Sequence, residues 1–166
     1  MKLTISLLFL LILSGCSATG PKYSEYQSSV LAIDKDSSRL FFYRRKRFSS
    51  NGIDAEIYVN DNKVGECANG AYFYTDVLAG NNEIKVENLL SPGTHKIKRN
   101  LKGGKEYYFE VLVDDDYVEA GILLGPLAQA LYISGKKNMS GWIFKQVPKR
   151  RAVSMLESKI FSLDGE

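Results

Sequence analysis

Residues 54–67, DAEIYVNDNKVGEC, carry the pattern that decides the fold. Apolar side chains alternate with polar or aromatic ones over residues 54–59, which is typical of a strand with one buried face. The Asn-Asp-Asn sequence at 60–62 favours a tight turn, because Asn and Asp tolerate left-handed backbone geometry. The stretch therefore predicts a β-hairpin whose second strand runs over residues 63–67.

Similar alternation recurs on both sides of this hairpin, about every ten residues, with turn residues in between. It predicts further strands at 39–44, 71–77, 83–87, 95–101, 107–113 and 142–147. This spacing is typical of an antiparallel sandwich, in which each sheet hides one face against the other. We therefore expect a mainly β fold, a small antiparallel β-sandwich of about seven or eight strands with a short C-terminal helix.

Two of these segments support more specific predictions. Asn69-Gly70 is a strong hairpin signal, so we expect it to join strands 63–67 and 71–77 as a pair. Residues 39–44 are apolar on both alternating faces, which predicts a strand that is buried on both sides or lies at an interface.

The last third of the chain departs from this rhythm. Residues 120–133 are largely apolar but are interrupted by two glycines and a proline. The segment is shorter than the roughly 20 apolar residues that a membrane-spanning helix needs. We expect a buried excursion or a short helix that covers one end of the sandwich, and a second membrane contact is the alternative. Apolar residues at helical spacing over 151–161 predict a short amphipathic helix packed on the sheet.

Composition sets the broad class. The chain has 166 residues, of which 45% are hydrophobic and 25% are charged, which excludes a disordered chain and a polytopic membrane protein. A formal net charge of +3 is too small to imply a nucleic-acid partner. The length fits a single domain.

The N-terminal residues have the pattern of a secretory signal, since Lys2 precedes a mainly apolar run over 3–13. Leu-Ser-Gly-Cys at 13–16 resembles the lipobox of bacterial lipoproteins, which implies cleavage between Gly15 and Cys16 and lipid attachment at Cys16. An ordinary secreted protein with a chance cysteine is the alternative. Ser17, where inner-membrane lipoproteins of proteobacteria carry Asp, implies an outer-membrane location facing the periplasm.

These patterns together predict the organisation of the chain. We expect a lipoprotein signal peptide over residues 1–15, a lipidated N-terminus with a flexible tether over 16–37, and a single β-sandwich domain over 38–166. The polar, Ser-rich composition after Cys16 is the basis for the tether.

Residues that could do chemistry are few. Lipidation of Cys16 would leave Cys67 as a lone thiol without a neighbouring basic residue, so we expect a small buried hydrophobe rather than a reactive cysteine. His95 is the only histidine, which excludes a multi-histidine zinc site. A weak candidate for Ca²⁺ is the acidic group of Asp114, Asp115, Asp116 and Glu119, which lacks the spacing of an EF-hand loop. We expect no cofactor, no metal and no catalytic residues.

Two surface features are candidates for contact with a partner. Anionic lipid headgroups, lipopolysaccharide phosphates or cell-wall carboxylates could contact two basic clusters, which are Arg44, Arg45, Lys46, Arg47 and Lys149, Arg150, Arg151. Solvated strand ends are the alternative for these clusters. Exposed aromatics on a sheet could form an interface, and the candidates are Tyr72, Tyr74 and Tyr108.

Four stretches carry a family resemblance: LFFYR at 40–44, IYVNDNKVGE at 57–66, NGAYF at 69–73 and GGKEYY at 103–108. They resemble the bacterial lipoprotein family called domain of unknown function 2846, which pairs a lipobox with a small β domain. The resemblance covers roughly residues 38–113 and, more weakly, 142–161. It has no counterpart for residues 114–140, and the turn at 79–81 lacks the proline of the family pattern. The resemblance implies a fold and a location but no catalytic residue.

Two functions follow as hypotheses. The first is a non-catalytic, lipid-anchored envelope lipoprotein that faces the periplasm and acts as a binding or structural accessory module. It would contact membrane lipid through acylated Cys16, and its surface would contact an envelope protein, lipopolysaccharide or the cell wall. The alternative is a ligand-binding, metal-binding or enzymatic periplasmic domain that uses the carboxylates at 114–119 or Cys67.

Overall fold

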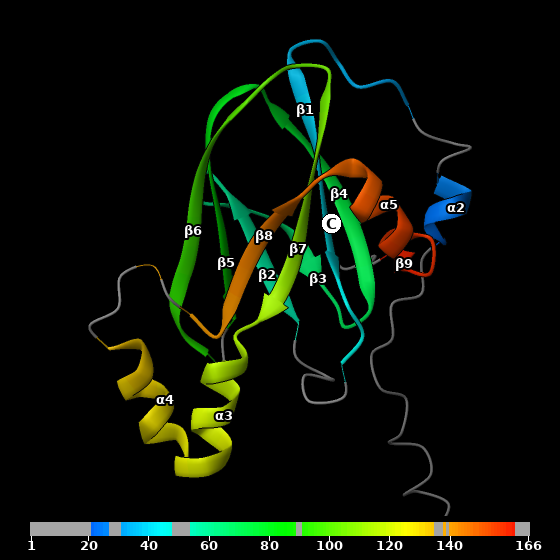
Figure 1. The fold of residues 1–166 in the computed structure, drawn as a ribbon. Helices are drawn as coiled ribbons and strands as arrows, with labels where there is room; N and C mark the ends of the chain where they lie inside the picture. Colours follow the sequence, from blue (N-terminus) through cyan, green and yellow to red (C-terminus); the bar gives the residue numbers. More distant parts are fainter. Residues whose placement is uncertain are drawn as a thin grey trace, which may run out of the picture.

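The structure is a computed structural model, and it describes residues 21–26, 31–47, 54–88, 91–134, 138 and 140–161. Within these residues two β-sheets pack face to face (Figure 1). The predicted signal peptide, its cleavage site and Cys16 lie outside the described residues.

The first sheet has five strands in the order β8-β7-β1-β4-β9. Their bounds are β8 (Trp142–Val147), β7 (Lys105–Val113), β1 (Ser37–Arg44), β4 (Ala71–Leu78) and β9 (Ile160–Phe161). The second sheet has four strands in the order β3-β2-β5-β6. Their bounds are β3 (Asn62–Cys67), β2 (Ala55–Val59), β5 (Gly80–Asn88) and β6 (Ser91–Leu101). The predicted mainly β sandwich is confirmed, although β1 pairs with β7, and β4 with β9, in parallel rather than antiparallel.

The core between the sheets is built from the alternate residues that the sequence pattern marks as apolar. Phe42 on β1 stacks on Phe73 at 5.1 Å and on Phe109 at 5.3 Å between ring centroids. Ile57 and Cys67 from the second sheet are fully buried in the same cluster. Cys67 is therefore the small buried hydrophobe that the sequence predicts.

The two turn signals have different outcomes. Asn60 and Asp61 adopt φ of 49° and 66° between β2 and β3, which confirms the predicted hairpin. Asn69-Gly70 also forms a turn, with φ of 81° at Gly70, but it joins β3 to β4, and these strands lie in different sheets. The predicted pairing of these strands is wrong, because the turn sequence sets the local geometry and not the sheet that the next strand joins.

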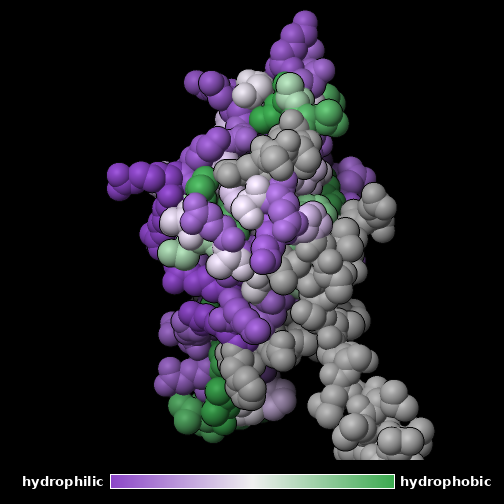
Figure 2. Space-filling view, turned by 90° about the vertical axis from the view of Figure 1, so that its right-hand side faces the viewer, coloured by the Kyte–Doolittle hydropathy of each residue, from purple (hydrophilic) through white to green (hydrophobic). Residues whose placement is uncertain are grey.

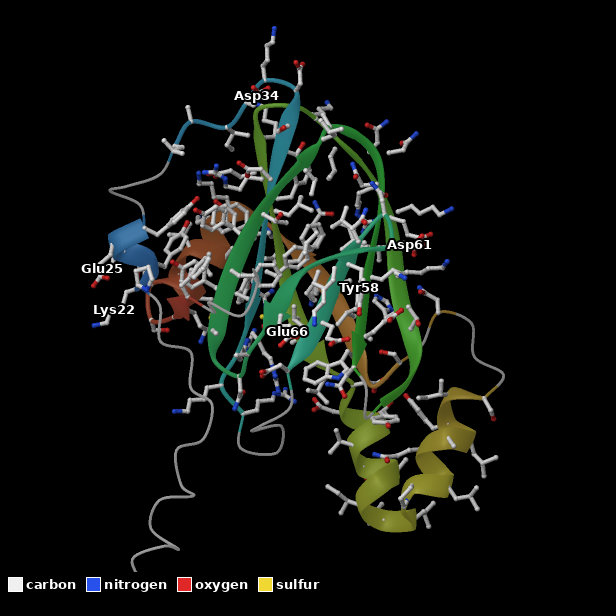
Figure 3. All side chains as sticks on the ribbon, turned by 180° about the vertical axis from the view of Figure 1, so that it is seen from behind. Lys22, Glu25, Asp34, Tyr58, Asp61 and Glu66 are labelled. Atoms are coloured by element: carbon white, nitrogen blue, oxygen red, sulfur yellow. The ribbon has the colours of Figure 1, made fainter. Side chains whose placement is uncertain are left out.

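The outer face of the five-stranded sheet is covered by two helices, α2 (Tyr23–Tyr26) and α5 (Lys149–Leu156) (Figure 1). Tyr23 and Tyr26 are buried against this face together with Leu156. The sequence predicts a flexible tether over 16–37, but Tyr23 and Tyr26 of this segment pack as part of the domain. Glu25 on α2, and Lys22 directly before this helix, point away from the sheet (Figure 3).

The C-terminal helix is shorter than the sequence predicts. It ends at Leu156 rather than at residue 161, and residues 160–161 form the edge strand β9 beside β4. Ile160 and Phe161, which continue the helical pattern in the sequence, form a strand instead, because the open edge of β4 offers backbone hydrogen-bond partners for them.

Residues 115–133 form two helices, α3 (Asp115–Leu124) and α4 (Pro126–Ile133), which project together from one end of the sandwich (Figure 1). We call them the α3–α4 hairpin. Gly125, with φ of 80°, ends α3, and Pro126 begins α4. The prediction of a helix is confirmed, but the prediction of burial is wrong, because α4 has no buried residue and α3 buries only Tyr117.

Candidate functional site

Strand register places the N-terminal segment, the basic segment after β1 and the α3–α4 hairpin at the same end of the sandwich. The backbone N–H of Phe161 donates to the carbonyl of Pro21 at 3.0 Å. Phe161 is paired with Tyr72 at the start of β4, and Tyr72 faces Tyr43 near the end of β1. Arg44 at the end of β1 pairs with Val111, close to where β7 leads into α3. We call this end of the molecule the hairpin end.

Arg44 is not part of a surface cluster. Its side chain points between the sheets and is 2% exposed, with the guanidinium 4.4 Å from the centre of the Trp142 ring. It donates a hydrogen bond to the carbonyl of Cys67 at 3.5 Å, and burial lowers its pKa. The prediction that Arg44 contacts an anionic partner is wrong, because alternation along β1 turns Arg44 inward and Arg45 outward.

Glu110 brings the two basic clusters together. Its carboxylate is 1% exposed and forms an ion pair with Arg45 at 2.5 Å, and with Arg151 at 4.0 Å. Tyr43 lies beside this group, and burial, with a smaller contribution from Glu110, raises the pKa of Tyr43 to about 12. Two cations predicted to face a partner therefore share one buried carboxylate within the domain.

Of the remaining basic residues, two form ion pairs and two are exposed. Arg47 forms an ion pair with Asp115 at the start of α3, and Lys149 pairs with Glu106 at 2.5 Å. Lys46 and Arg150 are exposed, and neither pairs with a carboxylate in the part of the chain that the structure describes. Lys46 lies at the hairpin end, two residues after β1.

The prediction that Tyr72, Tyr74 and Tyr108 form an exposed interface is wrong. Tyr72 and Tyr108 are buried and Tyr74 is half-buried, because α2 and α5 cover the face of the sheet that carries them. The ring of Tyr108 stacks on Phe41 at 4.8 Å. Tyr74 lies 4.6 Å from Tyr26. These residues form a second, aromatic core.

The acidic segment has a structural role. Asp114 caps the N-terminus of α3 by accepting hydrogen bonds from the backbone N–H groups of Asp116 at 3.1 Å and Tyr117 at 3.4 Å. Asp115 is paired with Arg47, and Glu119 lies within α3. No group of three or more potential metal ligands occurs among the described residues, so the weak Ca²⁺ candidate gains no support.

The α3–α4 hairpin carries the largest group of exposed apolar side chains at this end. The exposed fraction is between 64% and 77% for its aliphatic side chains Ile122, Leu123, Leu124, Leu127 and Leu131. In the space-filling view hydrophobic residues gather at the hairpin end, and a second group lies at the opposite end of the molecule (Figure 2). The described residues contain no helix that is long and apolar enough to span a membrane. Composition marks this segment as unusual, but only the structure reveals that its apolar side chains are exposed.

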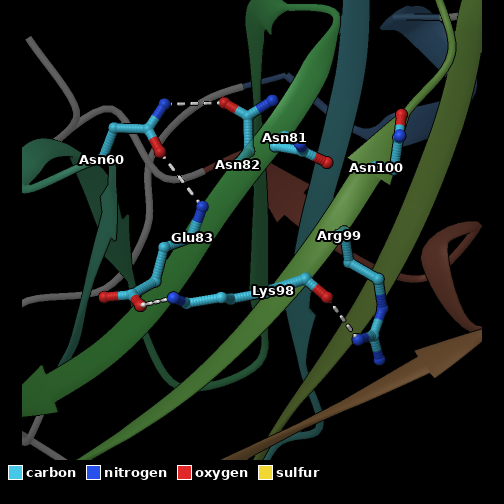
Figure 4. A pocket seen from close by; sticks show the side chains of 7 residues that line it. All are labelled: Asn60, Asn81, Asn82, Glu83, Lys98, Arg99 and Asn100. Atoms are coloured by element: carbon cyan, nitrogen blue, oxygen red, sulfur yellow. Dashed lines mark hydrogen bonds and ion pairs between the residues drawn. The ribbon is translucent and has the colours of Figure 1, made fainter.

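An open depression of about 450 Å³ lies at the opposite end of the sandwich, over the β2–β3 turn and β5–β6 (Figure 4). The Asn60 amide donates to Asn82 at 2.8 Å and accepts from the backbone N–H of Glu83 at 3.0 Å. These polar groups therefore hold the turns of the second sheet, and Asn60 belongs to the turn that the sequence pattern predicts at 60–62.

Comparison with known proteins identifies the family. The family described as "Protein of unknown function (DUF2846)" matches residues 34–122, which include β1 to β7 and most of α3. The chain is also similar to an uncharacterized protein of Haemophilus influenzae, with 30% identity over 136 residues, covering 78% of this chain and 76% of that protein. The matched range contains the four stretches on which the resemblance rests, and the chain belongs to the DUF2846 family.

Proposed function

We propose that this protein is a lipid-anchored component of the bacterial cell envelope, held in the outer membrane and facing the periplasm through an acylated Cys16. The sandwich then serves as a non-catalytic binding or structural module. The single observation that carries this proposal is the Leu-Ser-Gly-Cys sequence at 13–16, which lies directly ahead of a packed domain that begins by residue 21.

The spacing supports close attachment to the bilayer. Each CH₂ group of a buried acyl chain adds about 0.8 kcal/mol to membrane affinity, so two or more chains on Cys16 give a stable anchor. Fully extended, the link from Cys16 to Pro21 spans at most about 17 Å. Because α2 packs on the sheet, the domain would be held next to the membrane and not at the end of a long tether.

A non-catalytic role is supported by the structural contacts that the potentially reactive side chains already make. Burial raises the pKa of Cys67 to about 12, so its thiol is protonated at neutral pH and is not a nucleophile. Asp114 caps a helix, and Glu110 holds two arginines. The exposed cations Lys46 and Arg150 remain for contact with an anionic envelope component, which could be lipid, lipopolysaccharide or cell wall.

Fatty-acid labelling tests the anchor, and the two cysteines supply a matched pair of variants. The full chain is expressed in a Gram-negative host that is fed an alkyne-bearing fatty acid, and the purified protein is probed for the label. We expect label on the parent and on Cys67→Ser, and none on Cys16→Ser. Equal labelling of Cys16→Ser, or none on any of the three chains, would rule out the anchor.

A further inference from the structure

We propose that the tip of the α3–α4 hairpin inserts into the lipid bilayer and forms a second, non-covalent membrane contact. The tip consists of Ile122, Leu123, Leu124 and Leu127, and Leu131 extends the exposed apolar surface along α4. The inference rests on the proposed function for the position of the bilayer, and it adds a lipid-binding surface and an orientation.

Apolar side chains are distributed around the tip of the hairpin. Ile122, Leu123 and Leu124 are consecutive, so about 100° separates neighbours and together they cover more than half of the circumference of α3. All three are more than two-thirds exposed. A helix that docks into a protein groove presents one apolar stripe, whereas apolar side chains all round a helix are typical of an apolar medium such as lipid.

The polar groups of the hairpin are directed away from its tip. Residues 120–134 include no charged side chain. Gln129 donates its amide to the carbonyl of Tyr117 at 3.3 Å, towards the base of α3. The phenol of Tyr132 lies 3.4 Å from Asp114, also at the base.

The backbone of the turn is also compatible with lipid. The N–H of Gly125 donates to the carbonyl of Gly121 at 3.0 Å, and the N–H of Ala128 donates to Gly125 at 3.1 Å. Pro126, at the first position of α4, has no N–H to satisfy. Internal pairing of these N–H groups lowers the cost of bringing the turn into contact with lipid.

The hairpin projects from the same end of the sandwich at which the N-terminal segment enters it. The chain enters the domain at Pro21, at the hairpin end, beside β9. Three strand spacings separate β9 from β7, which is about 14 Å. The ten residues of α3 extend about 15 Å, and the five-residue link from Cys16 reaches about 17 Å. A bilayer that holds Cys16 therefore lies within reach of the hairpin tip, and Lys46 at the same end would meet anionic headgroups.

Site-specific quenching tests the insertion. Lipidated full-length chain carrying Leu124→Cys receives an environment-sensitive dye, since Cys16 is acylated and Cys67 is buried. The protein is reconstituted into vesicles of phosphatidylethanolamine and phosphatidylglycerol with brominated acyl chains. Leu78→Cys is the matched control, because Leu78 is 75% exposed against 76% for Leu124 and lies at the other end of the sheet. We expect several-fold quenching at 124 and little at 78.

The outcomes separate this inference from the proposed function. Equal dye emission at 124 and 78, on chain that sediments with the vesicles, overturns the insertion and leaves the anchor intact. Quenching at 124 in a parent chain that proves to carry no lipid at Cys16 supports the insertion and rejects the anchor. A blue shift at 124 that needs no vesicles and grows with protein concentration overturns the insertion, because a second copy of the chain then covers the tip.

Discussion

Arg39 on β1 and Asp76 on β4 are cross-strand partners joined by two parallel hydrogen bonds of 2.7 Å, from Nε to Oδ1 and from Nη2 to Oδ2. The same guanidinium donates to the Tyr26 hydroxyl at 3.0 Å and to the carbonyl of Leu31 at 3.1 Å. One buried side chain thereby connects the segment that leads from the N-terminus to the outer face of the five-stranded sheet.

Replacing Arg39 tests this connection. Arg39→Met leaves the Asp76 carboxylate and the Tyr26 hydroxyl without their common donor, and we expect the free energy of unfolding to fall by about 2 kcal/mol, since Asp76 is partly hydrated. Urea titration followed by far-UV circular dichroism measures the change. Arg150→Met, at an exposed position, is the control and should change the free energy by less than about 0.5 kcal/mol. Equal midpoints for the two variants would contradict the role of Arg39.

The aromatic core predicts alkaline instability. Burial raises the pKa of Tyr26 and of Tyr43 to about 12, against about 10 for an unfolded chain. The neutral phenol is favoured in the folded state, so this contribution to stability is complete below pH of about 10 and is lost as the pH rises to about 12. Denaturant titrations across this range should show falling stability.

Tyr43→Phe supplies the matched variant for this pH effect. Its hydroxyl is buried and has no hydrogen-bond partner among the described residues, so the variant should match the parent at pH 7. It should also lose less stability above pH 10, because one phenol fewer must ionise. Identical pH profiles for parent and variant would argue against a buried neutral phenol at this position.

Asp114 distinguishes a helix cap from a metal ligand. Asp114→Ala removes the acceptor for two N–H groups of α3, and we expect protection of the α3 amides from hydrogen exchange to fall about fivefold, or about 1 kcal/mol. Asp114→Asn should retain the protection, since Asn caps helices as well as Asp. Added Ca²⁺ should leave the melting temperature of the parent unchanged. A Ca²⁺-dependent increase in melting temperature that Asp114→Asn abolishes would restore the metal-binding alternative.

Glu110 and Arg45 should be energetically coupled. Arg45→Ala leaves a buried carboxylate with only the more distant Arg151, and we expect a loss of about 2 kcal/mol. Glu110→Gln removes the negative charge that Arg45 pairs with. The loss of stability in the double variant should therefore be smaller, by about 1 kcal/mol, than the sum of the losses in the two single variants. Urea titrations of the four proteins give this coupling energy, and simple additivity would contradict the ion pair.

Much of the sandwich follows from the sequence because alternation reports one buried face directly. The β2–β3 hairpin and β7 are placed correctly for this reason. Alternation does not report whether the second face of a strand is also covered by another layer. The exposure predicted for Tyr72 and Tyr108 is wrong for this reason. The apolar run on both faces of β1 contained the missing signal, since a strand buried on two sides needs a second layer.

The candidate site depends on relationships that no local pattern encodes. The basic cluster at 44–47 is continuous in sequence, yet Arg44 and Arg45 leave opposite faces of β1, one towards Trp142 and the other towards Glu110. The burial of α2 depends on a face of the sheet that comes later in the chain, so the surrounding polar composition predicts a tether. The exposure of the hairpin tip depends on the direction in which α3 leaves the sandwich (Figure 1).

The central claim is that the hairpin end faces the membrane, and thiol accessibility at two positions in native envelopes tests it most directly. Leu124→Cys and Leu78→Cys are expressed as full-length chains, and isolated membranes are treated with a membrane-impermeant maleimide. The account predicts that position 124 is protected until detergent is added and that position 78 reacts at once. Rapid labelling at 124 with protection at 78, or equal rates at both positions before detergent, would contradict it.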